Sequence, residues 1–113
     1  DDPELRKAFR EKVERCWNWF CEDIQDCTPL ELLNRARKLE AARTSYILLK
    51  KPALPLECIQ YLIRFKDPLR VTYEEWLADS RNAPYDCILE VIYDAMEGSE
   101  PAEQRYELED GVL

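Results

Sequence analysis

Cysteines are the residues of this chain whose side chains are best suited to hold a metal. The sequence of 113 residues contains five cysteines and no histidine. Structural zinc sites draw their ligands from close pairs such as C-x2-C. On a continuous helix Cys16 and Cys27 would lie about 16 Å apart, and Cys21 would face away from both. We therefore expect these cysteines, with Cys58 and Cys87, to be small buried side chains, and we expect no metal and no cofactor.

Carboxylates are the remaining candidates for catalysis, because the absence of histidine removes the commonest general base. Glu74 and Glu75 are adjacent, but they lie at an expected helix start with no apolar pocket that would raise a pKa. The sequence contains no nucleophile elbow, phosphate-binding loop or dinucleotide fingerprint. We expect no enzymatic activity.

Four acidic residues near the C-terminus follow one another at helical spacing. Asp86, Glu90, Asp94 and Glu97 are separated by four, four and three residues, which places them on one face of a helix. We call these four residues the acidic ridge, and no lysine or arginine lies between them. One interpretation is a mimic of a phosphate backbone that occupies the basic channel of a nucleic-acid enzyme. The other is an ordinary solvated helix face that keeps the protein soluble.

Charge is distributed unevenly along the chain, whose net charge is −8. Residues 71–113 contain twelve acidic and two basic residues, and Glu75 and Asp79 extend the acidic character of the ridge. This balance argues against direct binding to nucleic acid or anionic lipid and favours a basic protein partner. Residues 34–70 contain nine basic and three acidic residues. On a helix the basic side chains between Arg35 and Lys51 form no continuous stripe, so we expect them to act as counter-ions.

Aromatic residues are densest at residues 17–20. Trp17 and Trp19 diverge by about 200° around a helix, so at least one of them must lie near the surface. Trp19 is either an interface anchor or a side chain at the edge of the core.

The pattern of apolar residues, caps and prolines predicts helices at about 3–27, 28–49, 56–65, 72–77 and 84–97. Asp2 is placed to cap the first helix. Thr28 with Glu31 and Thr72 with Glu75 have the spacing of capping boxes, and Gly98 is placed to end the last helix. We predict an all-α, compact single-domain bundle of four or five helices over residues 1–98, followed by an acidic, loosely ordered tail at residues 99–113. Its predicted core includes Leu5, Phe9, Val13, Phe20, Leu62, Phe65, Ile88 and Ile92.

Three segments, 28–37 (TPLELLNRAR), 46–49 (YILL) and 61–71 (YLIRFKDPLRV), followed by Trp76, resemble a protein family. The chain is similar over most of residues 5–97 to small helical proteins of conjugative and other mobile elements in gut Gram-positive bacteria, some of which accompany antirestriction or anti-CRISPR genes. The resemblance rests largely on core and capping positions and brings no catalytic residues. The cysteine-rich first helix and residues 106–113 (YELEDGVL) depart from it. What it implies is a role in the contest between mobile DNA and host defence.

Two functions follow as hypotheses. The first is a non-enzymatic inhibitor of a defence nuclease, such as a CRISPR effector or a restriction enzyme, which binds a basic protein surface through the acidic ridge. The second is an accessory adaptor of a conjugative element that binds another protein through an aromatic surface around Trp19. The odd number of cysteines and the lack of a long apolar run indicate a cytoplasmic protein with no membrane segment. The sequence does not indicate an oligomeric state.

Overall fold

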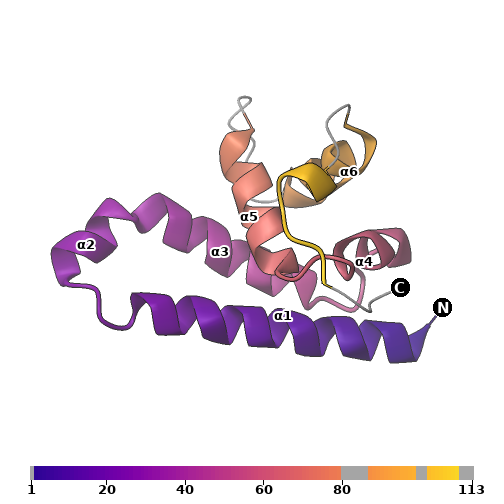
Figure 1. Cartoon of the computed structure of the whole chain (residues 1–113), viewed down its shortest axis with the longest axis horizontal. Helices are drawn as coiled ribbons and strands as arrows, with labels where there is room; N and C mark the ends of the chain where they lie inside the picture. The colour runs from indigo at the N-terminus through magenta and orange to yellow at the C-terminus, as the bar shows by residue number, and fades with distance from the viewer. Residues whose placement is uncertain (1, 80–86, 99–101, 110–113) are drawn as a thin grey trace.

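The computed structural model describes residues 2–79, 87–98 and 102–109, and in these ranges the regular structure is helical. The six α-helices are α1 (Pro3–Ile24), α2 (Pro29–Asn34), α3 (Ala36–Leu49), α4 (Leu56–Leu62), α5 (Pro68–Ala78) and α6 (Ile88–Glu97) (Figure 1). A short 3-10 helix, η2 (Ala102–Gln104), follows. The predicted all-α class is confirmed for the described residues, with six helices in place of four or five.

Helix α1 begins where its N-terminal sequence predicts. The Asp2 carboxylate accepts a hydrogen bond from the backbone N–H of Leu5 at 3.0 Å, and Pro3 occupies the first turn. The helix ends at Ile24 rather than near Cys27. Its buried stripe packs against α3, α4 and α5. The predicted core is buried as expected except for Leu5, which is only half-buried; the buried members are Phe9, Val13, Phe20, Leu62, Phe65, Ile88 and Ile92.

The segment predicted as one helix from residue 28 to residue 49 consists of two helices. The capping box is present: the Thr28 N–H donates to the Glu31 carboxylate at 3.0 Å, and the Glu31 N–H donates to the Thr28 hydroxyl at 3.2 Å. Arg35 then leaves helical geometry, with φ −105° and ψ 11°. Nothing in α2 is buried, whereas α3 buries Ala41, Ala42, Ser45 and Leu49. In Figure 1 α3 runs back beside α1, and α2 lies at the far end of this pair.

Helix α5 begins four residues earlier than predicted. The Asp67 carboxylate accepts from the Arg70 N–H at 3.0 Å, and Pro68 follows in the first turn. Thr72 is buried inside the helix, where its hydroxyl donates to the Pro68 carbonyl at 2.9 Å. The capping box predicted at Thr72 is therefore wrong, because the local pattern does not distinguish an N-cap hydroxyl from one that bonds the preceding turn.

Helix α6 packs against α4 and α5 through Ile88, Val91 and Ile92. The predicted start of this helix near residue 84 lies outside the described residues. Gly98 ends the helix with extended backbone, φ −64° and ψ 154°, and not in the left-handed conformation of a glycine cap.

The C-terminal segment, residues 102–109, lies across the loop between α4 and α5. Leu108 forms an antiparallel bridge with Phe65, the Lys66 N–H donates to the Glu107 carbonyl at 2.9 Å, and the Glu109 N–H donates to the Arg64 carbonyl at 3.0 Å. Ala102 is fully buried. These contacts attach residues 102–109 to the loop between α4 and α5. The division of the chain into a domain at 1–98 and a tail at 99–113 stays a prediction.

Candidate functional site

The described part of the acidic ridge lies on the outer face of α6. Glu90, Asp94 and Glu97 are exposed, while Ile88, Val91 and Ile92 on the opposite face are buried. Asp86, the fourth member, lies outside the described residues. Burial of the apolar face therefore directs three carboxylates from the same helix into solvent.

Glu75, which the sequence places with the ridge, has a different role in the structure. One of its carboxylate oxygens accepts from the Arg105 guanidinium at 2.7 Å, and the other accepts from the Tyr106 hydroxyl at 2.8 Å. Burial, and then the hydrogen bond to Glu75, raise the pKa of Tyr106. Asp79 follows α5 as its C-cap, where its N–H donates to the Trp76 carbonyl at 3.2 Å. Glu75 thus holds the C-terminal segment to α5.

The acids of the C-terminal segment also contact neighbouring bases. Glu103 pairs with Arg64 at 2.5 Å, and Glu107 lies 3.6 Å from Lys66. Glu109 pairs with Lys12 of α1. A hydrogen bond from Lys12 lowers the pKa of the Glu109 carboxyl. Much of the acidity that the sequence shows near its C-terminus therefore attaches this segment to the helices.

The basic residues of α3 make two kinds of contact. Arg43 lies 3.6 Å from Glu40, and Lys50 lies 2.7 Å from Glu14, as expected for counter-ions. The Arg37 guanidinium instead lies 5.3 Å from the centre of the Trp76 ring. Lys38 similarly lies 5.9 Å from the Tyr73 ring. These cation–π contacts link α3 to α5 and have no signal in the sequence.

Trp17 and Trp19 have different surroundings, as their angular separation predicts. The Trp17 ring stacks on Tyr46, with centroids 4.5 Å apart and planes at 10°. It also stacks on Phe20 at 5.7 Å. Trp19 is 43% exposed, so the expectation that one of the two lies near the surface is confirmed.

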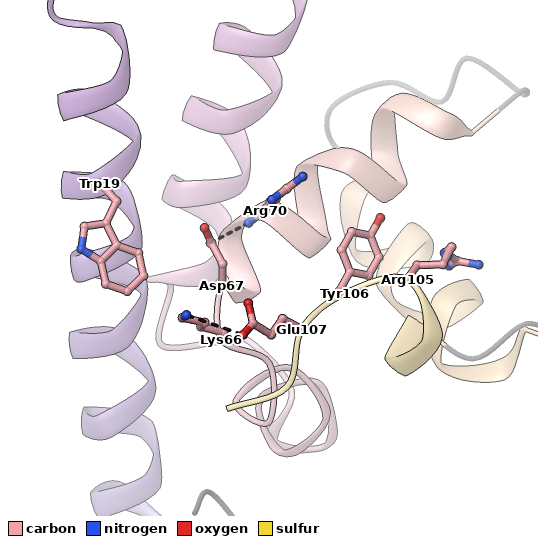
Figure 2. Close-up of a pocket in the computed structure, with 7 residues that line it drawn as sticks. All are labelled: Trp19, Lys66, Asp67, Arg70, Arg105, Tyr106 and Glu107. Carbon is pink, nitrogen blue, oxygen red and sulfur yellow. Dashed lines mark hydrogen bonds and ion pairs between the residues drawn. The ribbon is translucent and has the colours of Figure 1, made fainter. Parts of the chain in front are cut away.

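Trp19 forms one side of a pocket of about 280 Å³. In Figure 2 Trp19 stands on α1, Arg105 and Tyr106 stand on the opposite side, and the turn that precedes α5 lies between them. We call this cavity the Trp19 pocket. Its lining residues come from three parts of the chain and are Trp19, Lys66, Asp67, Arg70, Arg105, Tyr106 and Glu107.

Two leucines of α2 are the most exposed large apolar side chains of the described chain. Leu30 is 67% exposed and Leu33 is 72% exposed. The sequence pattern does not single them out, because residues 28–37 resemble a core and capping pattern. The sequence feature that could indicate a shared exposed face is the spacing of three residues between Leu30 and Leu33, which places them side by side on a short helix.

The five cysteines lie in two environments: Cys16 and Cys58 are buried, and Cys21, Cys27 and Cys87 are half-buried. Burial raises the pKa of the Cys16 thiol to about 12. Across residues 2–79, 87–98 and 102–109, no group of three or more cysteine or acidic side chains is arranged to hold a metal ion. Within the same residues no helix has the length and apolar character needed to cross a membrane.

Comparison of the chain with protein-family models, with curated proteins and with solved structures gave no match.

Proposed function

We propose that this chain is a non-enzymatic protein-binding module whose helix α6 binds a basic protein surface. In this proposal it is encoded by a mobile element and inhibits a nucleic-acid-targeting defence nuclease, such as a CRISPR effector or a restriction enzyme. The observation that carries the proposal is the two-sided character of α6: Glu90, Asp94 and Glu97 are exposed, and the apolar face that fixes the helix is buried.

The geometry of α6 suits a surface that normally binds a phosphate backbone. Charges four residues apart on a helix are displaced by about 6 Å along its axis, which is of the same order as the charge spacing of a nucleic-acid strand. Like charges at this spacing repel by a few tenths of a kcal/mol per pair. Helix α6 itself contains no lysine or arginine, so a basic partner would bring opposite charge to this face.

Three acidic residues outside α6 are excluded from the proposed contact because they already have partners within the fold. Glu75, Glu103 and Glu109 take part in contacts that hold the C-terminal segment. A partner that recruited them would have to break these contacts. We therefore place the contact on Glu90, Asp94 and Glu97 and leave Glu75 out of it.

A double charge reversal tests the proposal. Glu90→Lys with Asp94→Lys should leave the fold intact and abolish protection of an invading plasmid or phage in cells that carry the sensitive restriction or CRISPR system. The matched control is Glu11→Lys with Glu22→Lys, which makes the same change in net charge on exposed positions of α1. Equal protection by the two folded variants would remove α6 from the mechanism.

A second candidate function is an adaptor that binds another protein of the element through apolar side chains. The exposure of Leu30 and Leu33 on α2 and of Trp19 on α1 favours it, since exposed large apolar groups are typical interface anchors. Salt separates the two candidates: binding through α6 should weaken steeply as ionic strength rises, whereas binding through the leucines should be salt-tolerant. Leu30→Gln with Leu33→Gln should disrupt only the second kind of binding.

A further inference from the structure

The lining of the Trp19 pocket combines a flat apolar surface with an excess of positive charge. Lys66, Arg70 and Arg105 contribute three cations, against two carboxylates from Asp67 and Glu107. This local excess occurs in a chain whose net charge is −8. Such a reversal of sign within a cavity favours an anionic ligand.

Both lining carboxylates have partners within the fold. Asp67 is the N-cap of α5 and accepts from the Arg70 N–H at 3.0 Å. Glu107 lies 3.6 Å from Lys66, and its side chain is 73% exposed. Exposed ion pairs contribute little to stability, so an anion entering the pocket can replace Glu107 at Lys66 at small cost.

Arg70 can contact a ligand without losing its present partner. Its Nε–H donates to Glu74 at 2.5 Å, and its side chain is 61% exposed. A guanidinium group has five N–H donors, so the remaining ones can contact a second acceptor. Figure 2 shows Lys66 and Arg70 extending in different directions near the start of α5, so one phosphate group would contact one of them directly, and the other would add to the positive charge of the pocket.

Trp19 is the residue of the pocket that can bind the apolar part of a ligand. Its indole is 43% exposed at the edge of the pocket, and an exposed indole is a stacking surface for a flat ring. The volume of about 280 Å³ is just below the range of roughly 300–1,000 Å³ typical of small-molecule sites, which restricts the ligand to a small molecule.

We propose that the Trp19 pocket binds a small phosphorylated molecule with a flat ring, of the size of a mononucleotide. The ring stacks on Trp19, and the phosphate contacts Lys66 in place of Glu107. This site is independent of helix α6 and of the function proposed for it. Because Arg105, Tyr106 and Glu107 form one side of the pocket, the bound ligand also ties the C-terminal segment to α1.

Calorimetric titration of the whole chain with adenosine 5′-monophosphate tests the proposal, with adenosine and inorganic phosphate as the two partial probes. The monophosphate should bind at least tenfold more tightly than either part, and binding should weaken as salt rises. Bound ligand should also slow amide hydrogen exchange at residues 102–109. Failure of the monophosphate to bind at millimolar concentration, or equally tight binding of phosphate alone, overturns the proposal.

Variants of the lining residues test whether the ligand binds in the Trp19 pocket. Trp19→Leu and Lys66→Gln should each weaken binding at least tenfold. Arg43→Gln is the matched control, because Arg43 is 62% exposed and lies 3.6 Å from a glutamate, as Lys66 does, and it should change binding less than twofold. Unchanged affinity in both pocket variants would show that the ligand binds elsewhere and contradict the assignment. Reversal of Glu90 and Asp94 should leave this binding intact, so the two proposals can fail separately.

Discussion

Lys12, a buried residue of α1, forms an ion pair with Glu109 of the C-terminal segment. The two residues are 97 positions apart in the chain. Lys12 is buried, and its ammonium group also donates to the Ile63 carbonyl at 2.7 Å. A lysine on the buried side of an amphipathic helix is unusual, because a charge removed from water needs a partner. Glu109 supplies that partner, so the C-terminal segment completes the core side of α1.

Replacing Glu109 by glutamine should therefore lower the free energy of unfolding by about 1–2 kcal/mol. Loss of one partner from a fully buried pair costs roughly 3–5 kcal/mol, and the smaller figure applies here because the Glu109 side chain is 37% exposed. Urea unfolding followed by circular dichroism measures the change. The control is Glu107→Gln, which removes a more exposed pair and should cost less than about 0.5 kcal/mol. Equal effects of the two variants would show that Lys12 does not depend on Glu109.

Stability should fall as the solution becomes acidic. Among the residues that the structure describes, four carboxyls have lowered pKa values. Hydrogen bonds from Lys50, Thr28 and Lys12 lower the pKa values of Glu14, Glu31 and Glu109, respectively. A backbone N–H and then Arg64 lower the pKa of Glu103. The unfolded chain, with glutamate pKa values near 4.3, binds more protons below that pH. The stabilisation is therefore present above about pH 4.3 and is lost as pH falls through the folded values.

Urea unfolding at pH 7, 5, 4 and 3 checks this expectation. Glu14→Gln should reduce the loss of stability between pH 5 and pH 3, because one of the four linked groups is absent. A free energy of unfolding that stays constant over this interval would contradict the assignment.

The sequence predicts the features of this fold that depend on short-range patterns. Asp2 and Thr28 are caps where the local sequence places them, and the apolar stripe of α1 is the buried one. The break at Arg35 could not be predicted in this way, because arginine is compatible with a helix. Only the tertiary structure shows that α3 is packed on one face and α2 is not. The capping box predicted at Thr72 is wrong for a similar reason, because the environment of Thr72 is set by tertiary burial rather than by its neighbours in sequence.

For the candidate sites as well, the sequence predicts what depends on short-range patterns and does not predict what depends on contacts between distant segments. Exposure of Glu90, Asp94 and Glu97 follows from helical spacing alone. The partners of Glu75 and Glu109 are 30 or more residues away, so no local pattern distinguishes these acids from exposed ones. The Trp19 pocket draws its lining from three distant segments. Spacing indicates that one tryptophan is near the surface, but it does not indicate which cations lie beside Trp19.

Truncation of two buried residues should distinguish the centre of the fold from the attachment of the C-terminal segment. Phe65→Ala and Ile92→Ala should each lower the free energy of unfolding by about 2–5 kcal/mol, since both side chains are buried. The Phe65 ring also meets the Tyr106 ring edge-on, with centroids 6.3 Å apart. Phe65→Ala should therefore speed amide exchange at residues 102–109 more than Ile92→Ala does. A loss below 1 kcal/mol in both variants would show that the buried helix faces are misassigned.

The five thiols should react in two groups, because the thiolate is the reactive form and burial disfavours it. Cys16 and Cys58 are buried, and burial raises both of their thiol pKa values, that of Cys16 to about 12. The nearby Asp67 carboxylate raises the Cys16 value further. Cys21, Cys27 and Cys87 are half-buried. Iodoacetamide at pH 7.5 should alkylate these three in the native protein.

Mass spectrometry of peptides from native and guanidinium-treated samples measures this difference. Cys16 should be the slowest thiol to react in the native protein, and all five should react once the chain is unfolded. Cys21 provides the internal reference, since it lies on the same helix and is only half-buried. Equal native rates for Cys16 and Cys21 would mean that α1 opens from the core on the timescale of labelling. In that case α1, on which Cys16 lies, would pack against α5 more weakly than the structure indicates.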